Sequence, residues 1–163
     1  MPEEARGKAG KPTEKRNKPE RPRDDLGRPQ PWGAENTLRL EDYDSLTREE
    51  NHRLAREHLA AGRYFPAHEA WETAWKQSRD TEDAEFFKGL SQLGAGYTHL
   101  MRGNAHGAIR LLLRGAGRVR RYPSGHHAVD TERVAGAAET LAAEIETGKV
   151  IPGDNAVFEH PEA

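Results

Sequence analysis

From about residue 47 onward, apolar side chains recur every three or four positions along the chain. That spacing places them on one face of an α-helix and leaves the opposite face polar. Few segments show the alternation of apolar and polar residues that is typical of a half-buried strand. The spacing therefore predicts an all-α fold, a compact bundle of about five helices.

Signals for helix starts and stops divide this region into five expected helices. Thr47 and Glu50 have the spacing of a capping box, while Asn104 and Asp130 are residue types that favour the N-cap position. A glycine follows several of the expected last turns, where it favours a helix stop. The expected helices span residues 48–61, 64–78, 82–102 (capped by Asp80 or Thr81), 105–121 and 131–147.

A weak internal repeat relates two of the expected turns. The residues around Gly62 read A-G-R-Y-F-P-A, and those around Gly103 read R-G-N-A-H-G-A. Each places a glycine between two helices, which favours antiparallel helical hairpins packed together as in a tetratricopeptide-like stack. Any helical hairpin also favours a glycine in its turn, so the repeat remains a hypothesis.

The two ends of the chain differ in composition from this helical region. Residues 1–35 hold six of the ten prolines and nine Lys/Arg against seven Asp/Glu. Such a segment cannot bury enough apolar surface to offset its loss of conformational entropy on ordering. We therefore expect a disordered, basic, proline-rich tail over residues 1–40, a helical domain over 41–148 and a loose C-terminal tail over 149–163.

Several classes of protein are disfavoured by composition. The chain has no cysteine, which excludes disulfides, thiolate zinc sites and cysteine nucleophiles. Its N-terminus has no apolar run of the secretory type, and it has no stretch of about 18 apolar residues that could span a membrane. We therefore expect a cytoplasmic protein with no membrane partner, and we leave open whether it forms a homo-oligomer.

Nucleic acid is not an expected partner. The net charge of −2 gives no general attraction to a polyanion. The expected fourth helix does carry a stripe of arginines, which could bind phosphate, but no aromatic residues are interleaved with them. A solvated outer face is the favoured interpretation of this stripe, which consists of Arg110, Arg114, Arg118 and Arg121.

The expected second helix contains the sequence His68-Glu69-Ala70-Trp71-Glu72. His68 and Glu72 are four residues apart and therefore project from the same face of a helix. The arrangement resembles the zinc motif H-E-x-x-H with its second histidine replaced by glutamate. Because catalytic zinc accepts both histidine and carboxylate ligands, we interpret this pair as the start of a metal site that needs a further ligand from another helix.

The expected third helix offers that ligand. Its polar or small residues form one continuous stripe, Glu85, Gly89, Gln92, Gly96 and His99, which we expect to face the second helix across a narrow gap. The resulting hypothesis is an enzyme in which His68, Glu72 and His99 hold zinc or manganese. In it, Glu69 activates water as general base and Gln92 orients the substrate or the water.

A second hypothesis assigns no catalysis to these residues. His68, Glu72, Gln92 and His99 would form a buried polar network that fixes helix register in a helical-repeat interaction module. Separately, His126 and His127 are adjacent in an expected loop, a pattern that is usually incidental but could bind adventitious metal.

Two motifs carry a resemblance to a known family. Residues 62–75 match the form F-x-x-H-E-x-x-E-x-x-W, and residues 86–108 match G-L-x-Q-x-x-x-x-x-x-H-x-x-x-G-N-x-x-G-A. Over about residues 48–122 the chain thus resembles the domain of unknown function 309 family of bacteria and archaea. Members form a compact α-helical bundle and are often labelled predicted metal-dependent hydrolases. The resemblance therefore implies a polar site between the second and third helices.

Overall fold

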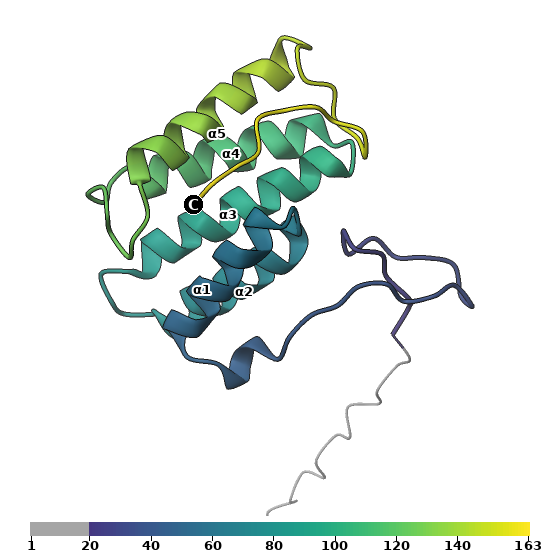
Figure 1. The fold of residues 1–163 in the computed structure, drawn as a ribbon, viewed down its shortest axis with the longest axis horizontal. Coiled ribbons are helices and arrows are strands. Elements are labelled where there is room, and N and C mark those ends of the chain that lie inside the picture. The colour runs from purple at the N-terminus through teal and green to yellow at the C-terminus, as the bar shows by residue number, and fades with distance from the viewer. Residues whose placement is uncertain (1–19) are drawn as a thin grey trace, which may run out of the picture.

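The computed structural model describes residues 20–163 and confirms the predicted all-α fold (Figure 1). Among these residues there is no strand, only two isolated bridges. Of the disordered tail predicted over residues 1–40, residues 1–19 lie outside the described part of the chain, and residues 20–40 are described and form no helix. The described residues form the 3-10 helix η1 (Tyr43–Ser45) and the helices α1 (Arg48–Ala60), α2 (Tyr64–Gln77), α3 (Ala84–Met101), α4 (Ala105–Val119) and α5 (Thr131–Glu146).

Four of the five helices, α1, α2, α4 and α5, begin where the sequence predicts, and three of them have the predicted cap. Thr47 and Glu50 form a complete capping box at the start of α1. The side chains of Asn104 and Asp130 each accept a hydrogen bond from the main-chain nitrogen three residues on. These caps satisfy main-chain donors that have no partner within the helix, and so they fix where the helix begins.

The start of α3 differs from the prediction. The helix begins at Ala84 with Asp83 in the cap position, and the Asp83 side chain makes no capping hydrogen bond. Asp80 has a positive φ of 62° in the turn before the helix, and Thr81 donates its hydroxyl proton to the main-chain oxygen of Ser78. The expected cap at Asp80 or Thr81 is therefore wrong, and the Asp83 carboxylate is engaged elsewhere.

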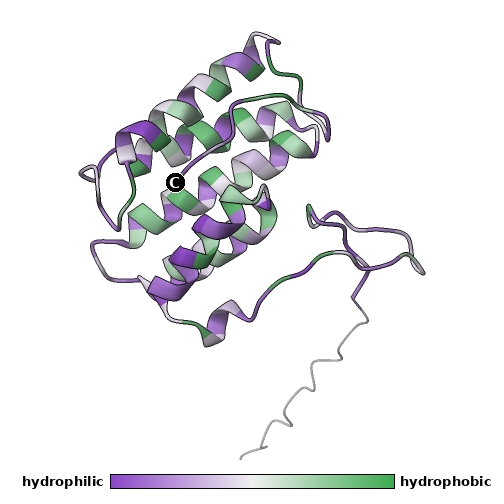
Figure 2. Ribbon diagram, viewed as in Figure 1, coloured by the Kyte–Doolittle hydropathy of each residue, from purple (hydrophilic) through white to green (hydrophobic). Residues whose placement is uncertain are grey.

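Each helix packs against the next one along the chain, from α1 to α5. The arrangement places α3 in the middle of the bundle, between α2 and α4 (Figure 1). Buried apolar residues of α3 contribute to the core. Along the helices, hydrophobic and hydrophilic residues are interspersed, as is typical of helices with one buried face (Figure 2). The fully buried apolar side chains of α3 are Phe86, Phe87, Leu90 and Leu100.

Glycines on two faces of α3 allow its neighbours to approach closely. A Cβ at Gly89 or Gly96 would lie 2.8–2.9 Å from side-chain atoms of α4. A Cβ at Gly94 would lie 2.9 Å from the Cα of His68 on α2. The expectation that Gly89 and Gly96 face α2 is therefore wrong: they pack against α4, and Gly94 is the glycine that faces α2.

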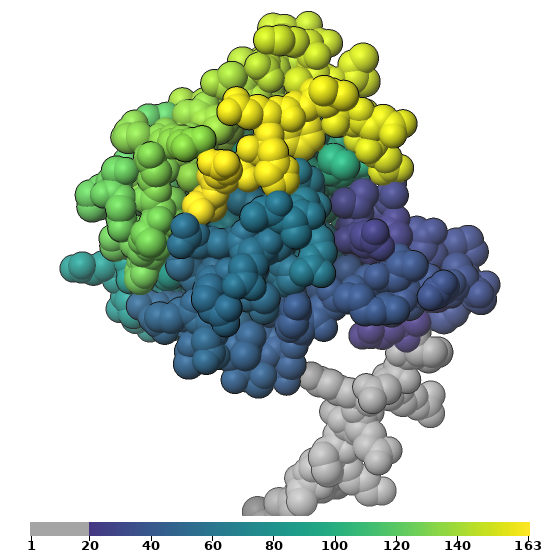
Figure 3. Space-filling model, in the orientation of Figure 1, coloured from purple at the N-terminus to yellow at the C-terminus, as the bar shows by residue number. Residues whose placement is uncertain are grey.

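Segments outside the helices pack on the bundle. Near the N-terminus, Gly27 lies against the Phe65 ring, and Arg102 donates to the main-chain oxygen of Leu26. Near the C-terminus, residues 149–163 run back over the helices (Figures 1 and 3).

The C-terminal segment does not match the expected loose tail. Gly153 donates its main-chain proton to the oxygen of Leu100 at 2.9 Å, and Phe158 stacks near Tyr97. Pro161 is buried. The sequence around Pro152 and Gly153 prevents a helix but does not prevent packing, because extended chain can still bury its apolar side chains.

None of the helices within residues 20–163 is long and apolar enough to cross a membrane.

Replacing Gly94 by alanine is expected to lower the free energy of unfolding by about 1–3 kcal/mol, because the new methyl group would overlap main-chain atoms of α2 that cannot move independently. Urea denaturation of the two proteins measures this difference.

Gly117 in α4 is the matched control, because nothing lies within 4 Å of its added Cβ. Gly117→Ala is expected to raise the free energy of unfolding by about 0.5–1 kcal/mol through helix propensity alone. Equal effects of the two substitutions would contradict the close approach of α2 and α3.

Candidate metal centre

The candidate site lies on the half-buried side of α2. One face of this helix is buried in the core through residues that include Trp71. The adjacent face carries His68, Glu69 and Glu72, whose side chains are partly exposed. The 3.6-residue period of the helix thus holds one imidazole and two carboxylates together at the edge of the core.

The His68 ring is fixed in orientation by α3. Its Nδ1 lies 2.8 Å from the main-chain oxygen of Ser91 and 3.0 Å from the Ser91 hydroxyl oxygen. Because a carbonyl oxygen only accepts, Nδ1 carries a proton and donates it to Ser91. The Nε2 atom is therefore directed to the other side, where it lies 3.3 Å from the Glu72 carboxylate.

The three groups influence one another's protonation. Burial acts to lower the pKa of His68, but its contacts with Glu72 and the Ser91 carbonyl outweigh that effect and raise the pKa. The hydrogen bond from His68 lowers the pKa of Glu72 to about 2. Burial raises the pKa of Glu69. Two carboxyl groups on neighbouring positions of one helix therefore have pKa values shifted in opposite directions.

These residues have the donor atoms of a metal site. One ring nitrogen of His68 and one oxygen each of Glu69 and Glu72 lie within 4.8 Å of one another. A mixed set of imidazole and carboxylate ligands suits zinc or manganese. In addition, metal-binding histidines usually donate their second ring N–H to a carbonyl or carboxylate, as His68 does to Ser91.

The other two predicted site residues do not join this cluster. Gln92 accepts a hydrogen bond from Arg118 of α4 at 3.1 Å. His99 lies 3.1 Å from the side-chain amide of Asn104 through its Nδ1. Of the expected set, the structure brings together His68, Glu69 and Glu72, while Gln92 makes its contact with α4 because the stripe that contains it packs on that helix.

One residue of the site was missed by the sequence analysis. Ser91 holds the His68 ring, and together with Gly94 and Thr98 it forms a stripe of small buried residues at i, i+3 and i+7. This second stripe, adjacent to the predicted one, is the face of α3 that lies against α2. The sequence carried both stripes, but periodicity could not decide which of them faces α2.

The arginine stripe of α4 is mostly exposed. Arg110 and Arg114 of α4 are exposed, as expected for a solvated outer face, and Arg121, which lies just after the end of α4, is exposed as well. Arg118 is half-buried, and its guanidinium bridges Glu85 at 2.9 Å and Gln92 at 3.1 Å. This bridge ties α4 to α3.

The pair of His68 and Glu72 is expected to stabilise the fold only within a window of pH. The raised pKa of His68 means that its contribution is complete below the usual value of 6.5 and is lost as pH rises through the raised value. The lowered pKa of Glu72 means that its contribution is complete above 4.5 and is lost as pH falls toward about 2. At about pH 5.5 both groups are charged.

In the presence of a chelator, Glu72→Gln is therefore expected to lower the free energy of unfolding by about 0.5 kcal/mol at about pH 5.5 and by less at about pH 9. Denaturant titrations at the two pH values measure the change. The control is Glu57→Gln, which removes an exposed i, i+4 pair with Arg53. Since Arg53 stays charged, Glu57→Gln should change the free energy of unfolding by the same amount at both pH values. If Glu72→Gln also changed the free energy of unfolding by the same amount at both pH values, a protonated His68 would be ruled out as the partner of Glu72.

The comparisons with known proteins agree with the motifs. A family described as Domain of unknown function (DUF309) matches residues 52–111, from α1 to the first half of α4. The matched range contains the whole His68, Glu69 and Glu72 cluster together with Ser91. No curated protein and no solved structure matches the chain. The predicted resemblance to this family is thereby confirmed over the part of the chain that builds the candidate site.

Proposed function

We propose that this domain is a metal-dependent hydrolase in which His68 and Glu72 hold a divalent cation and Glu69 acts as general base. The observation that carries the proposal is the hydrogen bond from His68 Nδ1 to the main-chain oxygen of Ser91. It fixes the ring so that Nε2 is directed at Glu72, which is how a metal-binding histidine is commonly held.

The chemistry of His68 and Glu72 supports a bound cation between them rather than an ion pair formed by the two side chains alone. Glu72 remains ionised over the whole physiological range, since its pKa is about 2. His68 becomes a metal ligand when it releases the Nε2 proton, and a cation beside Glu72 replaces the positive charge that is lost. A bound zinc or manganese ion would supply a Lewis acid that polarises the bond to be cleaved.

Glu69 is the residue best suited to proton transfer. Its side chain is half-buried beside the pair, and burial raises its pKa. A carboxylate that binds a proton more readily is a better general base near neutral pH than a fully solvated one. Gln92 and His99 contact Arg118 and Asn104 instead, so in the proposed site solvent or substrate would complete the coordination in place of the further ligand predicted from α3.

Metal binding is tested first, by elemental analysis of the tag-free full chain after incubation with zinc or manganese and removal of excess ion. We expect stoichiometric metal at this site in the parent chain and its loss in His68→Ala. The matched control is His106→Ala, which removes an exposed histidine from α4. Metal content that is unchanged in His68→Ala would refute the site.

Turnover is tested with chromogenic carboxylic and phosphoric esters. Glu69→Gln is expected to retain bound metal and to lose hydrolysis by about 100-fold or more, because a general base contributes about that much. Loss of the metal in this variant would instead make Glu69 a ligand. Retention of full activity would remove it from the mechanism.

A second candidate function rests on the order in which the helices pack. Each helix contacts the next along the chain, and the turns after α1 and α3 both use a glycine with positive φ. Helical-repeat proteins of this construction commonly bind peptides or partner proteins. In that case His68→Ala would destabilise the fold equally with and without metal, whereas a metal site on α2 predicts that metal raises the melting temperature more in the parent chain than in His68→Ala.

A further inference from the structure

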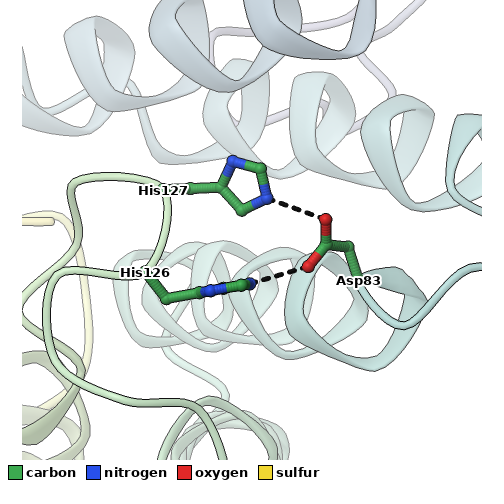
Figure 4. Close-up of side chains that lie close together, drawn as sticks. All are labelled: Asp83, His126 and His127. Carbon is green, nitrogen blue, oxygen red and sulfur yellow. Dashed lines mark hydrogen bonds and ion pairs between the residues drawn. The ribbon is translucent and has the colours of Figure 1, made fainter.

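A second cluster of metal-binding side chains lies away from α2, at the start of α3. Two adjacent histidines of the connection between α4 and α5 approach a single carboxylate, that of Asp83 (Figure 4). His126 Nε2 lies 2.7 Å from one oxygen of Asp83, and His127 Nε2 lies 2.9 Å from the other. This is the contact that occupies the Asp83 side chain and prevents it from capping α3.

The backbone of the connection is shaped so that both rings can reach the same group. Side chains of adjacent residues in an extended chain point to opposite sides. Here His127 and Ala128 have φ values of 46° and 63°, in a region that non-glycine residues rarely adopt. Main-chain hydrogen bonds close the turn, including one of 2.7 Å from Gly125 to Val129. The turn therefore holds both imidazoles on one side.

The core fixes these rings further. The Phe86 ring lies 4.8 Å from His126 and 5.6 Å from His127, measured between ring centroids. His52 of α1 reaches the main-chain oxygen of His127 at 2.9 Å through Nε2, while its Nδ1 accepts from Trp71. Burial lowers the pKa of His52 to about 4, so the ring is neutral and donates to that oxygen from Nε2. Contacts with α3 and with α1 thus both fix the position of the connection between α4 and α5.

We propose that Asp83, His126 and His127 form a divalent transition-metal site that takes zinc and clamps the connection between α4 and α5 to the start of α3. The three donor atoms lie within 4.8 Å of one another. Two imidazoles and one carboxylate are a ligand set of known zinc sites, with solvent completing the coordination.

The surroundings allow an ion to enter. The three side chains keep between 19% and 27% of their surface exposed, so zinc can reach them without unfolding. Zinc binding would replace the two Nε2–H protons that now bind the carboxylate. Arg48 also lies near Asp83, with Nη1 3.4 Å from the same oxygen that His127 contacts. That contact is longer than either histidine contact, and the ion would displace it.

The clamp joins segments that are far apart in the sequence. Asp83 is 43 residues from His126, and the two lie on opposite sides of the α3–α4 hairpin in chain order. A ligand that binds only when these segments are together stabilises the folded state. The site shares no residue with the α2 cluster, so either can exist without the other.

The experiment is a titration of zinc chloride into the full, tag-free chain that carries His68→Ala, which removes the α2 cluster. We expect this protein to bind one zinc ion and to melt at a higher temperature with zinc than with chelator. Adding His126→Gln or His127→Gln is expected to weaken zinc binding by at least about tenfold and to abolish the thermal shift. Glutamine can still donate a hydrogen bond to Asp83, so each variant keeps the polar contact.

Two further measurements distinguish this site from adventitious zinc binding by surface histidines. His106→Ala and His160→Ala in the same background remove exposed imidazoles, and both variants should retain the zinc ion. The side-chain nitrogen NMR signals of His126 and His127 should shift on zinc addition, which reports binding independently of stability. Zinc binding that survives both glutamine variants, or signals that do not respond to zinc, would overturn the proposal.

Discussion

The arrangement of the candidate site depends on how closely α2 approaches α3 at Gly94. With no Cβ at that position, the Cα of His68 lies where only a glycine can face it. This brings Ser91, one turn earlier on α3, within hydrogen-bonding distance of the His68 ring. The ring is then fixed with Nε2 toward Glu72, so a packing constraint between two main chains sets the protonation pattern of a side chain. A larger residue at Gly94 would move α2 away and release the ring.

The pKa values of His52, which is buried, and of His68, which is half-buried, are shifted in opposite directions because their neighbours differ. His52 and His68 each donate a ring proton to a main-chain oxygen. His68 has Glu72 beside it, and its pKa is raised despite burial. For His52, burial together with nearby cations such as Arg56 outweighs its hydrogen bond to His127 and lowers its pKa to about 4. The first ring is the one that we propose as a metal ligand, whereas the second serves as a neutral support for the His127 main chain.

Much of the fold follows from local features of the sequence. The capping box at Thr47 and the caps at Asn104 and Asp130 define helix starts through contacts within four residues, and all three are confirmed. The predicted cap of α3 is wrong, because Asp80 has a positive φ and Thr81 donates to Ser78. Asp83, which occupies the cap position, binds histidines 43 and 44 residues away instead of capping the helix. The packing of residues 149–163 was likewise missed, since it depends on contacts with helices that are distant in the sequence.

By itself the sequence determined the helices, their apolar faces, and the cluster of His68, Glu69 and Glu72, because each of these depends on the 3.6-residue period of one helix. Only the tertiary structure decided which stripe of α3 faces α2, since Gln92 and Ser91 are neighbours in sequence but point to different helices. It also decided that His126 and His127 meet Asp83. The physical reason is that periodicity fixes the relative directions of side chains within a helix, whereas the rotation of one helix against another is set by how their surfaces fit together.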